Sequence, residues 1–257
     1  MSFFGVTVLT WLYVASCMLV ATYVQALTGF AFSLLFIALI STFDLVPLEE
    51  ATNAISVITL IQTAVFFRAN PLQHDWKFIR PAIAPSILGV LVGAGLLVWL
   101  SGTALYLLKY MLGGVIVLTA LTMLANPVTW PQVSPPRHFQ VTGLLSGLMG
   151  GLFSTAGPPL VYLLYRQPMP QRLVHQCLFL MFAIGQLVRL AFIALAGSFT
   201  WRSLLYIVLS LPILLLVQHT HHRFPLQLSA QATTRLAAAL LILAGAGLIY
   251  SSWLVQP

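Results

Sequence analysis

Arg189 is the one charged residue that lies well inside a long apolar segment of this sequence. A cation in the lipid core is costly, so such a residue is a candidate for binding or conducting an ion. If the segment at 173–196 is helical, four polar side chains share an arc of about 100° on it: Arg172, His175, Gln186 and Arg189. This stripe could line an anion pathway. Alternatively, Arg189 reaches the nearer membrane surface, because it lies close to the segment's end.

A second polar stripe follows Pro47. On a helix at 48–67, five side chains fall within about 80°: Glu49, Thr52, Ser56, Thr59 and Thr63. When Pro47 is aligned with Pro170, four polar residues of one segment meet polar residues of the other: Glu49 with Arg172, Thr52 with His175, Asn53 with Gln176, and Thr63 with Gln186. Polar residues are scarce in this chain, so the matches indicate a duplication.

Two apolar runs are too long for one membrane crossing. As helices, Thr7–Ile40 would measure about 51 Å and Phe139–Tyr165 about 40 Å, against a hydrocarbon core of ~30 Å. Each contains a cluster that we predict breaks the helix, at 25–29 and at 150–159, because glycine and proline disfavour a helix interior.

A broken helix leaves backbone N–H groups without partners, and such groups suit an anion. The second break adds the hydroxyl groups of Ser154 and Thr155, followed by Gly157 and Pro158. Thr28 and Gly29 hold the equivalent place in the first. The alternative is that these glycines only allow close helix packing, as small residues do in membranes.

The composition indicates a polytopic helical membrane protein. Only 6% of the 257 residues are charged, 60% are apolar and the mean hydropathy is +1.00, whereas soluble proteins carry about 25% charged residues. The net charge of +7 comes from cations scattered singly at the ends of apolar runs. We therefore expect a lipid bilayer around the chain and no nucleic acid bound to it.

We predict two repeats, at 1–125 and 139–257, joined by a proline-rich linker at 126–138. If each broken run enters the membrane and returns, each half crosses an odd number of times. Eight cationic residues then share one side: Arg68, Lys77, Arg80, Arg137, Arg166, Arg172, Arg223 and Arg235. Only Lys109 and Arg202 face the other. This asymmetry predicts inverted repeats with both termini outside the cell.

At the second break, the segment Gly143-Leu144-Leu145-Ser146-Gly147-Leu148-Met149-Gly150-Gly151-Leu152-Phe153-Ser154-Thr155-Ala156-Gly157-Pro158-Pro159-Leu160, with the helix that follows to Arg189, resembles the TauE/SafE family of sulfite-exporter-like transporters. The resemblance implies transport of sulfite or of sulfur-containing organic anions such as sulfonates. The family's first-half motif usually has several glycines and a proline, and here only Gly29 matches.

Enzymatic chemistry finds little support in the sequence. There is no Walker loop, no pair of carboxylates within a span and no Ser-His-Asp pattern. His219, His221 and His222 could ligate a metal, but no Cys, Asp or Glu lies nearby, and a basic interfacial loop explains them as well. We predict no cofactor, no metal site and no enzymatic activity.

We therefore predict a secondary transporter of a small anion in the inner cell membrane, working by alternating access. The alternatives are an intramembrane enzyme and a non-transporting scaffold. His175 is the candidate if protons are coupled to transport, and a homo-oligomer stays open. The predicted substrate-binding residues are Thr28, Gly29, Asn53, Ser154, Thr155, Gly157, Pro158, Gln176, Gln186 and Arg189.

Overall fold

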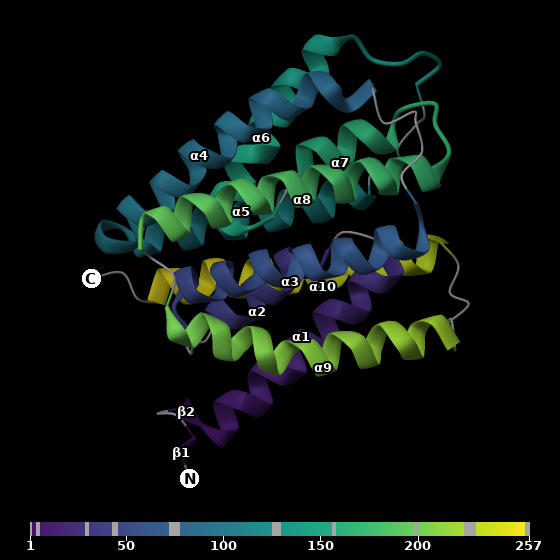
Figure 1. Cartoon of the computed structure of the whole chain (residues 1–257). Helices are drawn as coiled ribbons and strands as arrows, with labels where there is room; N and C mark the ends of the chain where they lie inside the picture. Colours follow the sequence, from purple (N-terminus) through teal and green to yellow (C-terminus); the bar gives the residue numbers. More distant parts are fainter. Residues whose placement is uncertain are drawn as a thin grey trace.

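Apart from one pair of two-residue strands, the described part of the chain is helical, as predicted. The computed structural model describes residues 2–3, 6–28, 31–42, 46–71, 78–124, 130–155, 158–197, 200–223 and 230–254. Its helices (Figure 1) are α1 (Val8–Thr28), α2 (Phe32–Thr42), α3 (Leu48–Ala69), α4 (Arg80–Thr103), α5 (Leu105–Leu124), α6 (Pro136–Phe153), α7 (Pro158–Tyr165), α8 (Gln171–Leu195), α9 (Trp201–Arg223) and α10 (Ala230–Leu254). Before α1, the two-residue strands β1 (Ser2–Phe3) and β2 (Val6–Thr7) pair antiparallel.

Several helices can cross a membrane. Within the described residues, four apolar spans are long enough: Leu48–Arg68, Arg80–Leu100, Tyr106–Leu124 and Gln171–Leu195. Large apolar side chains such as Leu88, Leu118 and Leu243 are more than half exposed on the outside of the bundle. In water such a surface would aggregate, and in lipid it is solvated. The chain is therefore a multi-pass membrane protein.

The first long apolar run is broken, as predicted, but later than expected. α1 continues through Gln25 to Thr28, and α2 begins at Phe32; Gly29 lies outside the described residues. The hydroxyl of Tyr13, early in α1, donates a hydrogen bond to the carbonyl of Leu39, late in α2, at 2.6 Å. α2 therefore folds back along α1. With 11 residues it is about 16 Å long and cannot cross the membrane alone.

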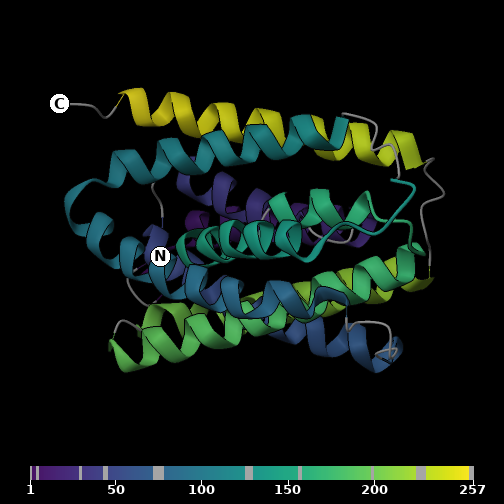
Figure 2. The ribbon, with the colours of Figure 1, turned by 90° about the horizontal axis from the view of Figure 1, so that it is seen from above.

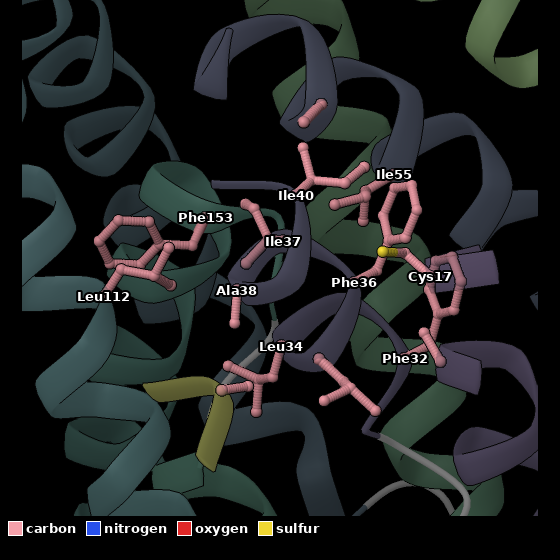
Figure 3. Close-up of a cluster of buried hydrophobic side chains, with 14 of the residues drawn as sticks. Cys17, Phe32, Leu34, Phe36, Ile37, Ala38, Ile40, Ile55, Leu112 and Phe153 are labelled. Carbon is pink, nitrogen blue, oxygen red and sulfur yellow. The ribbon is translucent and has the colours of Figure 1, made fainter. Parts of the chain in front are cut away.

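α2 is apolar around its whole circumference, which is typical of a helix buried on all sides. Phe36 and Ile37 are at most 1% exposed. The close-up shows side chains leaving α2 in different directions, some toward Phe153 of α6 and Leu112 of α5, others toward Ile55 of α3 (Figure 3). α2 is thus the centre of the larger hydrophobic core.

The second broken run also returns to the side from which it enters. α6 ends at Phe153, and α7 opens with Pro158, where a missing N–H costs nothing. After α7, the carbonyl of Arg166 accepts a hydrogen bond from the Trp130 amide at 2.7 Å. Trp130 precedes α6, so the end of α7 lies beside the start of α6. The predicted re-entrant arrangement is confirmed for this pair.

The glycines of α6 act differently from the prediction. The second break follows Phe153, within the predicted segment 150–159. Within that segment, Gly150 and Gly151 lie inside α6 and do not break the helix. A Cβ atom on Gly147 would lie 2.1 Å from the Ser86 carbonyl oxygen of α4, and one on Gly151 would lie 2.2 Å from that of Val90. α4 and α6 are therefore in backbone contact, and the packing interpretation holds for Gly151.

The hydrophobic cores do not follow the order of the sequence. α4, from the first half, begins in a smaller core with α6, α7 and α8 of the second half. Ile79, Phe139 and Leu164 belong to this core. The larger core joins α1, α2, α3, α5, α9 and α10 with the final residues of α4 and α6. From above, α5 lies alongside α10 (Figure 2), and α3 packs on α8. The two halves thus exchange helices.

Cationic residues gather at one end of this bundle. In Figure 1, α3 and α9 run from left to right, α4, α8 and α10 run back, and both termini lie toward the left. Arg68 therefore lies at the right-hand end, as do Arg80, Arg172 and Arg235 near the starts of their helices. Residues 218–223 belong to α9, so the loop predicted around His219, His221 and His222 is wrong, because the helix continues to Arg223.

Candidate functional site

Arg189 occupies the contact between α8, α3 and the end of α6. Its side chain is 0% exposed, so it does not extend to the membrane surface. Its Nε donates to the Gly151 carbonyl at 3.0 Å and its Nη2 to Thr52 Oγ1 at 2.8 Å. Its Nη1 lies 2.8 Å from Ser56 Oγ, 3.2 Å from Asn53 Oδ1 and 3.2 Å from the Thr52 carbonyl.

Every acceptor in these five contacts is a neutral oxygen. Glu49 acts on Arg189 electrostatically, but its carboxylate is not among the hydrogen-bond partners within the described residues. A buried cation without a carboxylate partner is energetically costly. An arginine side chain stays protonated in proteins, so the site carries a positive charge to which an anion would be attracted.

Ser154 completes this arrangement from the break after α6. It has φ 53°, in the left-handed region that few residues other than glycine occupy. Its hydroxyl donates to the Thr52 carbonyl at 2.7 Å and lies 3.0 Å from Ser56 Oγ. Its own carbonyl accepts from Gln186 Nε2 at 2.8 Å. We call Arg189, Thr52, Asn53, Ser56, Gly151 and Ser154 the Arg189 cluster.

The structure brings together some of the residues predicted from sequence. Asn53, Ser154, Gln186 and Arg189 meet in or beside this cluster. Thr155 follows Ser154, is 2% exposed, and its hydroxyl has no partner among the described residues.

Other predicted residues lie at the edge of the site or beyond it. Pro158 is buried at the start of α7. The side chain of Thr28, and Gly29 and Gly157, lie outside the described part of the chain. Gln176 donates to the Pro71 carbonyl at 2.8 Å, and Arg189 is 13 residues further along α8, about 20 Å. Gln176 thus belongs to the other end of the α3–α8 contact.

His175 is also remote from Arg189. Its Nε2 lies 2.9 Å from the Tyr165 hydroxyl, in the part of α8 that faces the end of α7. The polar stripe predicted on α8 therefore does not form one site. It divides into a group near Arg189 and a group near the cationic end of the bundle.

Thr52, Ser56 and the Gly151 carbonyl were not among the predicted binding residues. Thr52 and Ser56 carry a sequence signal, since both belong to the polar stripe on α3 and are 0% exposed. The Gly151 carbonyl carries none, because a backbone oxygen is present at every residue. Within the described residues, no group of three His, Cys, Asp or Glu side chains could hold a metal.

The left-handed backbone of Ser154 allows a prediction about stability. Ser154→Ala and Ser154→Gly both remove the hydroxyl, but only glycine adopts this conformation without the cost of about 1–2 kcal/mol. We expect the glycine variant to unfold at a higher temperature than the alanine variant, measured by fluorescence in detergent. Equal melting temperatures would contradict a left-handed residue here.

Comparison with known proteins places the chain in a family. It matches Sulfite exporter TauE/SafE over residues 14–248. It is 32% identical over 238 residues to the probable sulfite/organosulfonate exporter TauE of Cupriavidus necator, covering 91% of this chain and 93% of that protein. No solved structure matches it. The chain therefore belongs to the Sulfite exporter TauE/SafE family of membrane transporters.

Proposed function

We propose that this protein is a secondary carrier that moves sulfite or an organosulfonate across the inner cell membrane by alternating access. The observation that carries the proposal is Arg189, which is fully buried and, within the described part of the chain, hydrogen-bonded to neutral oxygens alone. An oxyanion would supply the missing negative charge and bring several oxygen acceptors of its own. The name of the relative from Cupriavidus necator, which mentions sulfite and organosulfonates, supports the same substrate class.

The arrangement of helices supports two inverted repeats, 1–125 and 139–257. Under this relation, the pair α4 and α6 corresponds to α9 and α1, and both pairs are in contact. Likewise α3 contacts α9, and α8 contacts α4. Inverted repeats with broken helices at the midplane are typical of carriers that alternate access.

We place the cationic end of the bundle in the cytoplasm, following the positive-inside rule. Both termini then lie outside the cytoplasm. An anion leaving the cell would first meet Arg68 and Arg172, which are exposed at the helix ends. Export is therefore the direction that we propose. If protons are coupled to this movement, His175 is the candidate, because its hydrogen bond to Tyr165 would change on protonation.

The decisive experiment is flux through purified protein in liposomes. We expect sulfite and a small alkanesulfonate to cross, acetate to cross poorly, and the transported molecule to be recovered unchanged. Protein-free liposomes at the same lipid composition serve as the control. Recovery of a converted product would favour an intramembrane enzyme, and flux no greater than in the control liposomes would favour a scaffold.

A further inference from the structure

A second contact joins α3 and α8 near the cationic end of the bundle. The rings of Phe66 and Phe179 are stacked with centroids 4.1 Å apart and planes 14° from parallel. Phe179 is 7% exposed. Stacked rings exclude water and present no hydrogen-bonding group to an anion. This contact is thus apolar, whereas the Arg189 cluster is polar and charged.

The repeat relation connects the two contacts. When Pro47 is aligned with Pro170, Phe66 aligns with Arg189 and Ser56 aligns with Phe179. The contact between Arg189 and Ser56 therefore corresponds to the contact between Phe66 and Phe179. The two contacts lie ten residues apart on each helix, about 15 Å along the α3–α8 seam.

Polar side chains without partners lie between these contacts. The Thr59 hydroxyl and both amide atoms of Gln62 are buried and have no hydrogen-bond partner among the described residues. The same is true of Gln186 Oε1 on α8. Thr59 shares an arc of about 80° on α3 with Ser56 and Phe66. A buried polar group without a partner is costly unless a ligand or water completes it.

We propose that the anion is held in this part of the α3–α8 seam, beside Thr59, Gln62 and Gln186, and that two repeat-related gates close it. The stacked pair Phe66 and Phe179 closes the cytoplasmic side, and the Arg189–Ser56 contact closes the outer side. Both gates are closed in this structure. The inference rests on the proposed function and on the inverted repeats.

The two gates differ in chemistry, so an anion meets different side chains on the two sides of the seam. Arg68 and Arg172 lie at the helix ends on the cytoplasmic side and would concentrate anions there. The aromatic pair offers the anion no counter-charge, so the anion passes it without being retained. Beyond it, the anion meets the donors of Thr59 and Gln62 and the charge of Arg189.

The test uses a cysteine reporter in the seam. In a Cys17→Ser, Cys177→Ser background, Thr59→Cys is labelled with a membrane-impermeant, negatively charged methanethiosulfonate, separately in inside-out and right-side-out vesicles. Phe66→Ala should raise the labelling rate from the cytoplasmic side by about tenfold, because a stacked aromatic pair is lost. Labelling from the outer side should stay unchanged.

Two further variants make the result specific. Phe179→Ala removes the other ring and should reproduce the cytoplasmic acceleration, even if Phe66→Ala does not fold. Phe67→Ala is the matched control, since Phe67 is adjacent in sequence, contacts Phe66 edge-on at 5.5 Å and is not part of the stacked pair. It should leave labelling as it is.

Acceleration from the outer side, or equally from both sides, would overturn the gate assignment. So would unchanged labelling in both Phe66→Ala and Phe179→Ala. Sulfite flux measured in the same vesicles separates this inference from the proposed function. If the side-specific acceleration appears but no anion crosses, the gates stand and the proposed substrate class fails.

Discussion

Arg189→Gln is expected to reduce sulfite flux by about two orders of magnitude or more. Removing one partner from a buried charged contact costs about 2–5 kcal/mol, and 1.4 kcal/mol corresponds to a factor of ten. Glutamine keeps an amide that can still donate to one of the oxygens around it, but it provides no positive charge. The measurement is initial flux into liposomes, normalised to protein that elutes as a single peak in detergent.

Arg172→Gln is the matched control for this prediction. It removes the same charge from the same helix, but Arg172 is exposed at the start of α8. We expect a change of at most a few fold, because exposed charges are screened by solvent and salt. If Arg189→Gln keeps half of the wild-type flux, or if Arg172→Gln loses as much, Arg189 is not the anion-binding charge.

Gly93→Ala is expected to destabilise the protein strongly, whereas Gly95→Ala is expected to be neutral or stabilising. A Cβ atom at Gly93 would lie 2.2 Å from the Leu148 carbonyl oxygen of α6, and one at Gly95 would meet nothing within 4 Å. Overpacking costs about 1–3 kcal/mol. Alanine at the open position gains up to ~1 kcal/mol of helix propensity.

The melting temperature of each variant is measured by thermal unfolding in detergent. Both variants replace one glycine of α4 with alanine, so a difference between them reports the contact with α6 and not the loss of a glycine. The expected order of melting temperatures is Gly95→Ala at or above wild type, with Gly93→Ala well below it. Gly147→Ala, on the opposing face of the same contact, should behave like Gly93→Ala. Equal stability of Gly93→Ala and Gly95→Ala would show that α4 and α6 are further apart than described.

Much of the fold could be predicted from the sequence, because membrane helices are recognised by length and apolar composition. The run from Thr7 to Ile40 had to break, since an unbroken helix would exceed the bilayer thickness. The position of the break was less predictable. α1 continues through Gln25 because nothing in Gln-Ala-Leu-Thr forbids a helix.

The role of the glycines could not be predicted from their type alone. Gly151 lies close to the break after α6. Because Gly151 has no side chain, the α6 backbone can contact Val90 of α4. Glycine disfavours a helix and permits close packing at the same time, and only the partner helix decides between these effects. Val90 precedes Gly151 by 61 residues (151 − 90) in the sequence.

The candidate site was predicted in part. A polar stripe placed Thr52 and Ser56 on one face of α3, and the buried charge identified Arg189. Gln176 was grouped with them because it aligns with Asn53 when Pro47 is aligned with Pro170. Such an alignment relates positions of the two halves and does not report distance along one helix. The correspondence of Phe66 with Arg189 could not be predicted for another reason. Most residues of a membrane segment are apolar, so the sequence does not distinguish Phe66 from its neighbours until its stacking partner is known.

The exchange of α4 between the halves has a consequence for biosynthesis. While the ribosome makes the first half, the glycine face of α4 has no α6 to contact, and lipid must cover it until residues 136–153 are inserted. The early nascent chain therefore depends on the membrane or an insertion factor to hold α4 in place. If the two halves are inverted repeats, as we propose, an ancestor that encoded one half would have had to pair with an oppositely oriented copy of itself to cover that face.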